Sequence, residues 1–239
     1  MPPKNPRKFA IFDIDGTVFR SSLLIEVTNA LIDAGIFPES VRKSYAREYV
    51  RWLDRKGVYD DYIDRVVDVF RRHIQGIHYR DFLRVAKRVV AGHKDRTYVY
   101  TRELVRELKK KKYFLLAISK SPKGIVENFA KELGFDKVYG SLYETDKKGR
   151  YTGGVLHLDL LSDKAKLLER AMQKENLILR GSVGVGDTES DIAFLELVSR
   201  PICFNPNRKL YDHARNAGWE VVVERKDVIY ERVAAKKWR

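Results

Sequence analysis

From residue 113 onward, short apolar segments of strand length alternate with longer segments that have helical periodicity. Strands are predicted at residues 113–119, 182–186, 201–204 and 219–224. Helices are predicted at residues 122–133, 162–175, 189–198 and 208–216. Crossovers of this kind join parallel strands and place helices on both faces of their sheet. The alternation therefore predicts an α/β fold with a doubly wound parallel sheet.

Two further segments complete the predicted sheet. Residues 8–14 form an apolar run that ends in acidic residues and is bounded by Gly16, which is typical of a buried strand. Residues 138–151 are strand-like, and DKKGR at residues 146–150 predicts a hairpin turn.

The stretch between the first two strands shows helical periodicity and no strand pattern. Its predicted helices cover residues 23–34, 39–56, 60–74 and 79–91. We expect this insertion to lie above the carboxyl ends of the strands, where open α/β sheets bind their ligands. The predicted division is therefore a core of residues 1–20 and 93–239 and a helical cap of residues 21–92.

Acidic residues cluster at two predicted strand ends. FAIFDIDGT places Asp13 and Asp15 two residues apart, followed by Gly16, which permits a sharp turn that presents backbone N–H groups to an anion. SVGVGDTESD places Asp187 after another strand and Asp191 in the first turn of a helix. Carboxylates in this arrangement suit Mg²⁺, which takes oxygen ligands and retains waters and a substrate phosphate. Each Asp alone also suits a turn or a helix cap, and for Asp191 alone that interpretation is favoured.

The order of four motifs resembles the haloacid dehalogenase superfamily: DIDGT, the Ser at the end of LLAIS, a Lys opening the helix after the hairpin, and GDTESD. The resemblance covers nearly the whole chain. The helical insert, the FNPN segment and the GW before the last predicted strand resemble the phosphoserine-phosphatase-like branch, subfamily IB. The resemblance implies a Rossmann-like core and a Mg²⁺-dependent phosphatase that acts on a small phosphorylated substrate.

The resemblance also implies roles for individual residues. Asp13 corresponds to the nucleophile that forms an aspartyl-phosphate, and Asp15 to the general acid and base. Asp13, the backbone carbonyl of Asp15 and Asp187 correspond to the Mg²⁺ ligands. Phosphoryl oxygens are expected to bind Gly16, Ser119 and Lys164, with Asp191 orienting the lysine or a metal-bound water.

Several basic residues and histidines are further candidates for the site. Lys166 is the alternative to Lys164, but residues two apart on a helix face different directions, and the spacing of Lys164 to residues 177 and 187 resembles the family. Surface positions are expected for Lys120 and Lys123, and solvated or hydrogen-bonded positions for His93 and His157. Specificity is expected from Arg and Tyr side chains of the cap, for example Arg47, Arg51, Tyr59 and Tyr62.

Two differences from members of this superfamily indicate which reaction and which substrate to expect. Dehalogenase members lack a carboxylate at the position of Asp15, so its presence favours phosphate ester hydrolysis. Phosphoserine phosphatases carry Ser-Gly-Gly in the second motif, whereas this chain reads SKSP from Ser119, which argues against an amino-acid substrate.

The net charge of +14, from 47 Lys and Arg against 33 Asp and Glu, allows a second hypothesis. Much of the excess lies at the two ends and at residues 109–112, where solvated surface commonly collects charge. The alternative is a basic nucleic-acid-associated protein that acts on nucleic-acid ends or has little catalytic activity. No nucleic-acid-binding motif supports it.

The compartment is expected to be the cytoplasm. The basic opening MPPKNPRK is not followed by a signal-peptide core, and the longest apolar runs are far shorter than the roughly 20 residues that span a bilayer. The single cysteine, Cys203, cannot form an internal disulfide and is expected to be a small buried residue.

Overall fold

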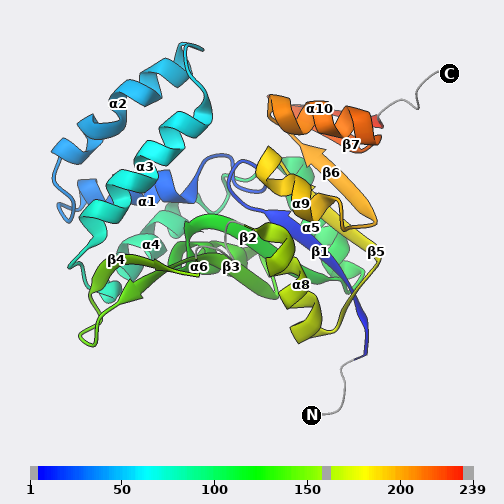
Figure 1. Ribbon diagram of the computed structural model, residues 1–239, viewed down its shortest axis with the longest axis horizontal. Helices are drawn as coiled ribbons and strands as arrows, with labels where there is room; N and C mark the ends of the chain where they lie inside the picture. Colours follow the sequence, from blue (N-terminus) through cyan, green and yellow to red (C-terminus); the bar gives the residue numbers. More distant parts are fainter. Residues whose placement is uncertain (1–4, 158–162, 234–239) are drawn as a thin grey trace.

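The computed structural model describes residues 5–157 and 163–233. One eight-stranded sheet with the order β4-β3-β2-β1-β5-β6-β7-β8 forms its centre (Figure 1). The strands are β1 (Arg7–Asp13), β2 (Phe114–Pro122), β3 (Lys137–Thr145), β4 (Tyr151–Leu156), β5 (Leu177–Gly186), β6 (Arg200–Phe204), β7 (Glu220–Arg225) and β8 (Val228–Val233). The six strands from β3 to β7 in this order pair in parallel, which confirms the predicted sheet.

The two edge strands of the sheet are antiparallel to their neighbours, and at the β3–β4 edge this is the predicted hairpin. β4 pairs antiparallel with β3 through the turn at residues 146–150, and β8 pairs antiparallel with β7. β8 was not predicted. Its sequence follows β7 after only two residues, Lys226 and Asp227, and its side chains Val228, Ile229 and Tyr230 are exposed, so no period-2 burial marks it as a strand.

Helices cover both faces of the sheet. The helices are α1 (Leu23–Asp33), α2 (Ser40–Leu53), α3 (Tyr59–Ile74), α4 (Tyr79–His93), α5 (Val99–Lys110), α6 (Lys123–Leu133), α8 (Lys164–Glu175), α9 (Ile192–Leu195) and α10 (Arg208–Ala217), with a 3₁₀ turn η1 (Glu189–Asp191) before α9. The predicted helix at residues 189–198 is thus shorter, since it is divided into η1 and α9. None of the described helices is both long and apolar enough to cross a lipid bilayer.

The central strand β1 shows why both faces are covered. Successive side chains of a strand point to opposite faces, and here both sets are apolar and fully buried. Phe9 and Ile11 belong to the apolar cluster that includes side chains of α8, α9 and α10. Ala10 and Phe12 belong to the cluster that includes side chains of α5 and α6. A strand buried on both faces leaves only its end for polar chemistry.

The insertion between β1 and β2 is helical, as predicted, with α1 to α4 beginning and ending within three residues of the expected bounds. The buried apolar side chains of α1, α3 and α4 form one continuous cluster with those of the sheet. In Figure 1, α2 and α3 extend beyond one end of the sheet as a helix pair. The start of α3 lines the same cavity as the end of β1, which places the insertion over the carboxyl ends of the strands.

Candidate active site

The acidic motifs meet at the carboxyl ends of three neighbouring strands. Asp13 pairs in register with Ile118 of β2, so Ser119 lies next to it, and Phe12 pairs with Val185 of β5, two residues before Asp187. A cavity of about 350 Å³ opens there between the sheet and α3. Its lining includes Asp13, Asp15, Ser121, Lys164, Asp187 and Tyr59.

A buried lysine joins two of the acids. Asp163 caps α8 by accepting a hydrogen bond from the backbone N–H of Lys166, so the helix begins at Lys164. Lys164 Nζ lies 2.6 Å from Asp13 Oδ1 and also binds Asp191 Oδ1. The other carboxylate oxygen of Asp191 accepts the backbone N–H groups of Asp187, at 3.0 Å, and Thr188, at 3.1 Å. Asp191 therefore fixes both the lysine and the turn after β5.

Burial controls the charge of these groups. Burial raises the pKa of Asp13 to about 7, although attraction by Lys164 opposes the shift. Burial also raises the pKa of Asp187 well above its usual range, and repulsion by Asp13 and Asp191 adds to it. Burial would lower the pKa of Lys164, but attraction by the two acids outweighs it and raises that pKa, so the lysine stays charged.

The carboxylate of Asp15 is held by three donors. Its Oδ1 accepts the backbone N–H of Leu23 at 2.6 Å, and its Oδ2 accepts the hydroxyls of Ser119 at 2.5 Å and Ser121 at 2.9 Å. Burial raises the pKa of Asp15, while these hydrogen bonds oppose the shift. A carboxyl with a raised pKa at the edge of the cavity can hold and release a proton.

The turn after β1 brings the two acidic motifs into contact. Thr17 Oγ1 donates a hydrogen bond to Asp187 Oδ1 at 3.0 Å. Gly16 has φ +86°, and a Cβ atom built on it would lie 2.2 Å from Asp187 Oδ2. Only glycine therefore allows the Asp187 carboxylate to approach this turn.

These residues fit a hard divalent cation. Asp13 and Asp191 contact the buried ammonium of Lys164, and Asp15 and Asp187 line the same cavity. Burial, with repulsion between neighbouring carboxyl groups, raises the pKa values of Asp13 and Asp187, and a cation bound beside them would favour their charged forms. Within the described ranges no three His, Cys, Asp or Glu side chains group as a metal site. The predicted Mg²⁺ ligands do not require such a group of three, because they are the side chains of Asp13 and Asp187 and the backbone carbonyl of Asp15.

Replacing Gly16 by alanine tests this close approach. We expect Gly16→Ala to lose about 1–3 kcal/mol of stability through its positive φ, and to lose activity as well because Asp187 must move. Gly35→Ala is the matched control, since Gly35 has φ +68° and no atom within 4 Å of the built Cβ. Thermal unfolding and Mg²⁺ titration of both variants check the prediction. Equal Mg²⁺ dependence in the two variants would refute it.

Two predicted phosphate ligands already have partners. The hydroxyl of Ser119 donates to Asp15 and accepts the backbone N–H of Ser121 at 2.9 Å. The N–H of Gly16 donates within its own turn, to the carbonyls of Phe19 at 3.0 Å and Ser21 at 3.2 Å. Of the predicted phosphate ligands, Lys164 lines the cavity directly.

Sequence reasoning missed two hydroxyl residues of the site. Thr17 binds Asp187, and Ser121 binds Asp15 while accepting the backbone N–H of Leu24 at 3.0 Å. Both lie inside quoted motifs, DIDGT and SKSP. The sequence signal for Ser121 is the second hydroxyl of SKSP.

The other lysines lie as expected, with one exception. Lys166 is exposed, is not among the residues that line the cavity and pairs with Asp163 at 3.2 Å. Lys123 pairs with Glu127 at 3.2 Å. The prediction of a surface position for Lys120 is incomplete, because this residue is exposed and also lines the cavity.

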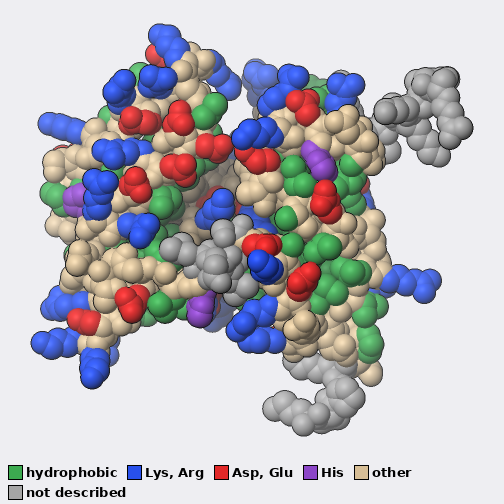
Figure 2. All heavy atoms as spheres, viewed as in Figure 1, with side chains coloured by type: hydrophobic (Ala, Val, Ile, Leu, Met, Phe, Trp, Pro, Cys, Tyr) green, Lys and Arg blue, Asp and Glu red, His purple; other side chains and the backbone are tan. Residues whose placement is uncertain are grey.

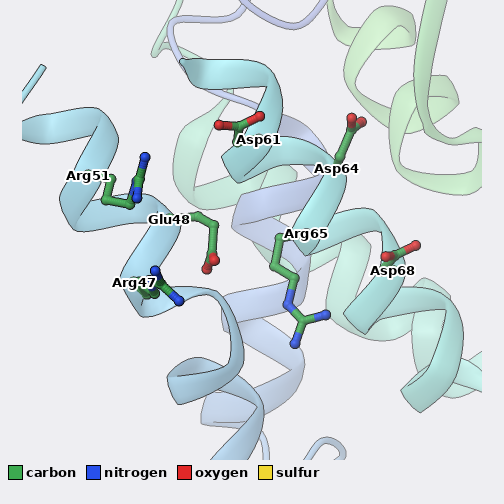
Figure 3. Close-up of a pocket in the computed structure, with 7 residues that line it drawn as sticks. All are labelled: Arg47, Glu48, Arg51, Asp61, Asp64, Arg65 and Asp68. Atoms are coloured by element: carbon green, nitrogen blue, oxygen red, sulfur yellow. The ribbon is translucent and has the colours of Figure 1, made fainter. Parts of the chain in front are cut away.

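The predicted cap residues separate into three places. Tyr59 lines the catalytic cavity. Tyr62 is buried and stacks on Trp52 with ring centroids 6.0 Å apart. Arg47 and Arg51 were expected to act in specificity, but they line a separate pocket of about 450 Å³ between α2 and α3, shown in Figure 3. The residue at the border of that pocket and the catalytic cavity is Asp64.

The remaining candidates take structural positions. His93 pairs with Glu26 at 3.2 Å, and His157 is exposed. Cys203 is a buried free thiol on β6, as expected, and burial raises its pKa to about 12. An unreactive thiol of this kind has no place in the chemistry.

The chain is similar to known proteins in sequence and in fold. The profile of haloacid dehalogenase-like hydrolases matches residues 10–196. A phosphoserine phosphatase of Archaeoglobus fulgidus is 32% identical over 114 residues, which cover 47% of this chain and 33% of that protein. A Bordetella pertussis protein of unknown function superposes with a TM-score of 0.73 at 18% identity, over 91% of this chain and 98% of that one. A phospho-aspartyl intermediate analogue of phosphoserine phosphatase superposes with a TM-score of 0.61 at 18% identity, over 93% and 96%.

Proposed function

The chain belongs to the haloacid dehalogenase-like hydrolases, in their phosphoserine-phosphatase-like branch, and from this membership we propose that it hydrolyses a phosphate monoester through an aspartyl-phosphate on Asp13. One observation carries the proposal. Asp13 lies at a strand end, lines the cavity and has one oxygen bound to the buried Lys164 at 2.6 Å, so the carboxylate is fixed with a cation beside it.

In the first step an oxygen of Asp13 forms a bond to phosphorus while the bond from phosphorus to the leaving oxygen breaks. Asp15 gives its proton to that oxygen, so the product leaves as an alcohol. In the second step Asp15 takes a proton from water, the water oxygen binds phosphorus, and the bond to Asp13 breaks. Inorganic phosphate leaves and both carboxyl groups return to their initial states.

The other residues position these two acids and the phosphoryl group. Lys164 would bind a phosphoryl oxygen and offset its charge, with Asp191 holding the lysine in place. Ser119 and Ser121 orient the carboxyl of Asp15. Binding of a phosphoryl oxygen by Ser119 requires its hydroxyl to turn away from Asp15, and binding by Gly16 requires its turn to open.

The proposed cofactor is Mg²⁺, held by the side chains of Asp13 and Asp187 and by the backbone carbonyl of Asp15. When bound, it offsets the repulsion between an anionic carboxylate and an anionic phosphate. The pKa values of Asp13 and Asp187, raised by burial, support a site that is completed by a cation.

Chelation is the direct test. Purified protein should hydrolyse phenyl phosphate with Mg²⁺, and EDTA should abolish this activity because two buried carboxylates then repel the substrate. Initial rates measured with EDTA, and again with EDTA already saturated with Mg²⁺, separate metal loss from other effects of the chelator. Full activity in excess EDTA would refute the assignment of Mg²⁺ as the cofactor.

A further inference from the structure

The catalytic cleft has a second branch. A cavity of about 690 Å³ lies between the α2–α3 connection and the start of α10, and it reaches Asp15 and Asp187 from the side of Gly16. Tyr59, at the start of α3, lines both this branch and the catalytic cavity. A substrate bound to the catalytic acids can therefore extend its leaving group in either of two directions.

The two branches differ in charge. Beyond the catalytic residues, the 350 Å³ cavity is lined by Asp60, Asp64 and Glu189 with Lys120 as its further cation, among the described residues. Beyond the same catalytic residues, the second branch is lined by Arg20, Arg55, Arg208 and Lys209 with Asp60 and Glu189. Figure 2 shows Lys and Arg side chains on both sides of the gap between α2–α3 and α10.

The arginines of the second branch are available for a ligand. Lys209 is already paired, because its Nζ lies 2.7 Å from Glu189. Arg208 binds Asp212 at 2.7 Å through Nε, and its terminal nitrogens have no partner within the described ranges. Arg20 and Arg55 are exposed and form no ion pair with any described residue, and the Arg20 guanidinium lies 5.5 Å from the centre of the Tyr98 ring. Guanidinium groups of this kind bind phosphate or carboxylate oxygens in pairs.

Aromatic rings lie among these arginines. Trp52, on α2, and Tyr98, just before α5, both line the branch, and both are half-buried. Trp52 contacts the rings of Tyr49, Tyr59 and Tyr62, and it stacks on Tyr62 at 15°. Tyr98 contacts Phe204 edge-on with centroids 4.9 Å apart. The rings are thus held by the protein and can contact a flat group of the ligand at little entropic cost.

We infer that the second branch binds the leaving group of the substrate, and that this leaving group is an anionic nucleotide: it carries an aromatic base and at least one further phosphate. The inference rests on the proposed phosphatase function. It follows from exposed guanidinium groups, two of them without an ion-pair partner among the described residues, and from aromatic rings in one cavity that opens onto Asp15. A nucleoside bisphosphate and the phosphorylated end of a short nucleic acid share this chemistry.

Volume and charge argue against a small cationic leaving group in this branch. A cavity of about 690 Å³ is in the range of cofactor-sized ligands and exceeds what an amino acid fills. A cationic leaving group would meet the arginines here, but it would find complementary acids in the other cavity. Preference for phosphoserine is therefore the outcome that contradicts the inference.

Binding can be tested without turnover. Asp13→Asn protein should bind adenosine 3′,5′-bisphosphate and a 5′-phosphorylated dinucleotide by titration calorimetry, and the tighter of the two identifies the source of the nucleotide. Adding Arg55→Gln and Arg208→Gln should weaken binding roughly fivefold or more, less so at high salt, because two cations near the second phosphate are removed. If neither nucleotide binds, or if the two arginine substitutions leave nucleotide binding unchanged, the inference is refuted.

A matched pair on α4 controls for charge. Arg84 pairs with Asp81 on its own helix as Arg208 does with Asp212, and Arg88 is exposed as Arg55 is. Arg84→Gln with Arg88→Gln removes the same charge away from the cleft and should leave nucleotide binding unchanged. Equal weakening by both pairs would show a nonspecific effect and overturn the inference.

Turnover separates this inference from the proposed function. In the otherwise unsubstituted protein, the ratio of kcat/KM for the preferred nucleotide over phenyl phosphate should fall roughly fivefold or more in the Arg55 and Arg208 variant. Hydrolysis of phenyl phosphate with no nucleotide preference would refute the inference and keep the phosphatase. Nucleotide binding without hydrolysis of any ester would refute the phosphatase and keep the nucleotide site.

Discussion

Asp13→Asn should lower phosphatase turnover by roughly 10⁴-fold or more, because a carboxamide cannot form the acyl-phosphate on which both steps depend. The fold should survive. Lys164 keeps its partner Asp191, and the pKa of Asp13, raised to about 7 by burial, means that the charge being removed is itself costly in the folded protein. We expect an unchanged or higher melting temperature together with the loss of activity.

The measurement is the initial rate with phenyl phosphate at saturating Mg²⁺, alongside thermal unfolding. Asp136→Asn is the matched control, because Asp136 is a carboxylate that binds the backbone N–H of Leu115, near the start of β2 and far from its catalytic end. This variant should retain its activity. Turnover by Asp13→Asn close to that of the unsubstituted protein would overturn the mechanism.

Asp15→Asn should slow turnover by roughly 10²–10⁴-fold and do so differently for different substrates. An aryl phosphate has a good leaving group that needs little protonation, so phosphorylation of Asp13 should survive better with it than with an alkyl phosphate. Hydrolysis of the phospho-enzyme should stay slow for both, because water has lost its base. Phosphate should therefore accumulate on Asp13.

Mass spectrometry after a brief pulse of aryl phosphate tests this outcome. The local structure should tolerate the change, since an amide oxygen can still accept the N–H of Leu23, and the hydroxyls of Ser119 and Ser121 can accept as well as donate. A phosphoryl adduct mapped to any residue other than Asp13 would contradict the assignment, as would equal rates for aryl and alkyl esters.

The centre of the fold could be predicted because its buried strands are continuous apolar segments in the sequence. β1 is apolar on both faces, which requires neighbours on both sides and helices above and below it. The carboxyl ends of parallel strands lie at one edge of the sheet, so the sequence predicts that Asp13 and Asp187 lie close together, and Thr17, in the turn after β1, donates a hydrogen bond to Asp187. Apolar patterns and strand ends of this kind can be recognised from the sequence alone.

The features that the sequence did not predict depend on local geometry that hydrophobic periodicity does not reveal. The hydroxyl of Ser119 donates to Asp15. This contact depends on the path of β2, which continues to Pro122, beyond the predicted strand end at residue 119. Arg47 and Arg51 share a helix face that turns away from the catalytic cavity, and helical periodicity states which residues share a face but not where that face points. β8 lies at an edge with exposed side chains, so burial did not mark it.

The strand order also bears on how this chain is made. β1 is translated early but needs β2, about a hundred residues later, on one side and β5 on the other, and the contact of Lys164 with Asp13 spans 151 positions. Until β5 leaves the ribosome, one edge of an apolar strand stays open, and open edges of this kind pair with other chains. The helices α1 to α4 emerge in the interval and can pack locally first. A nascent chain thus has a vulnerable period that ends only when the catalytic centre is complete.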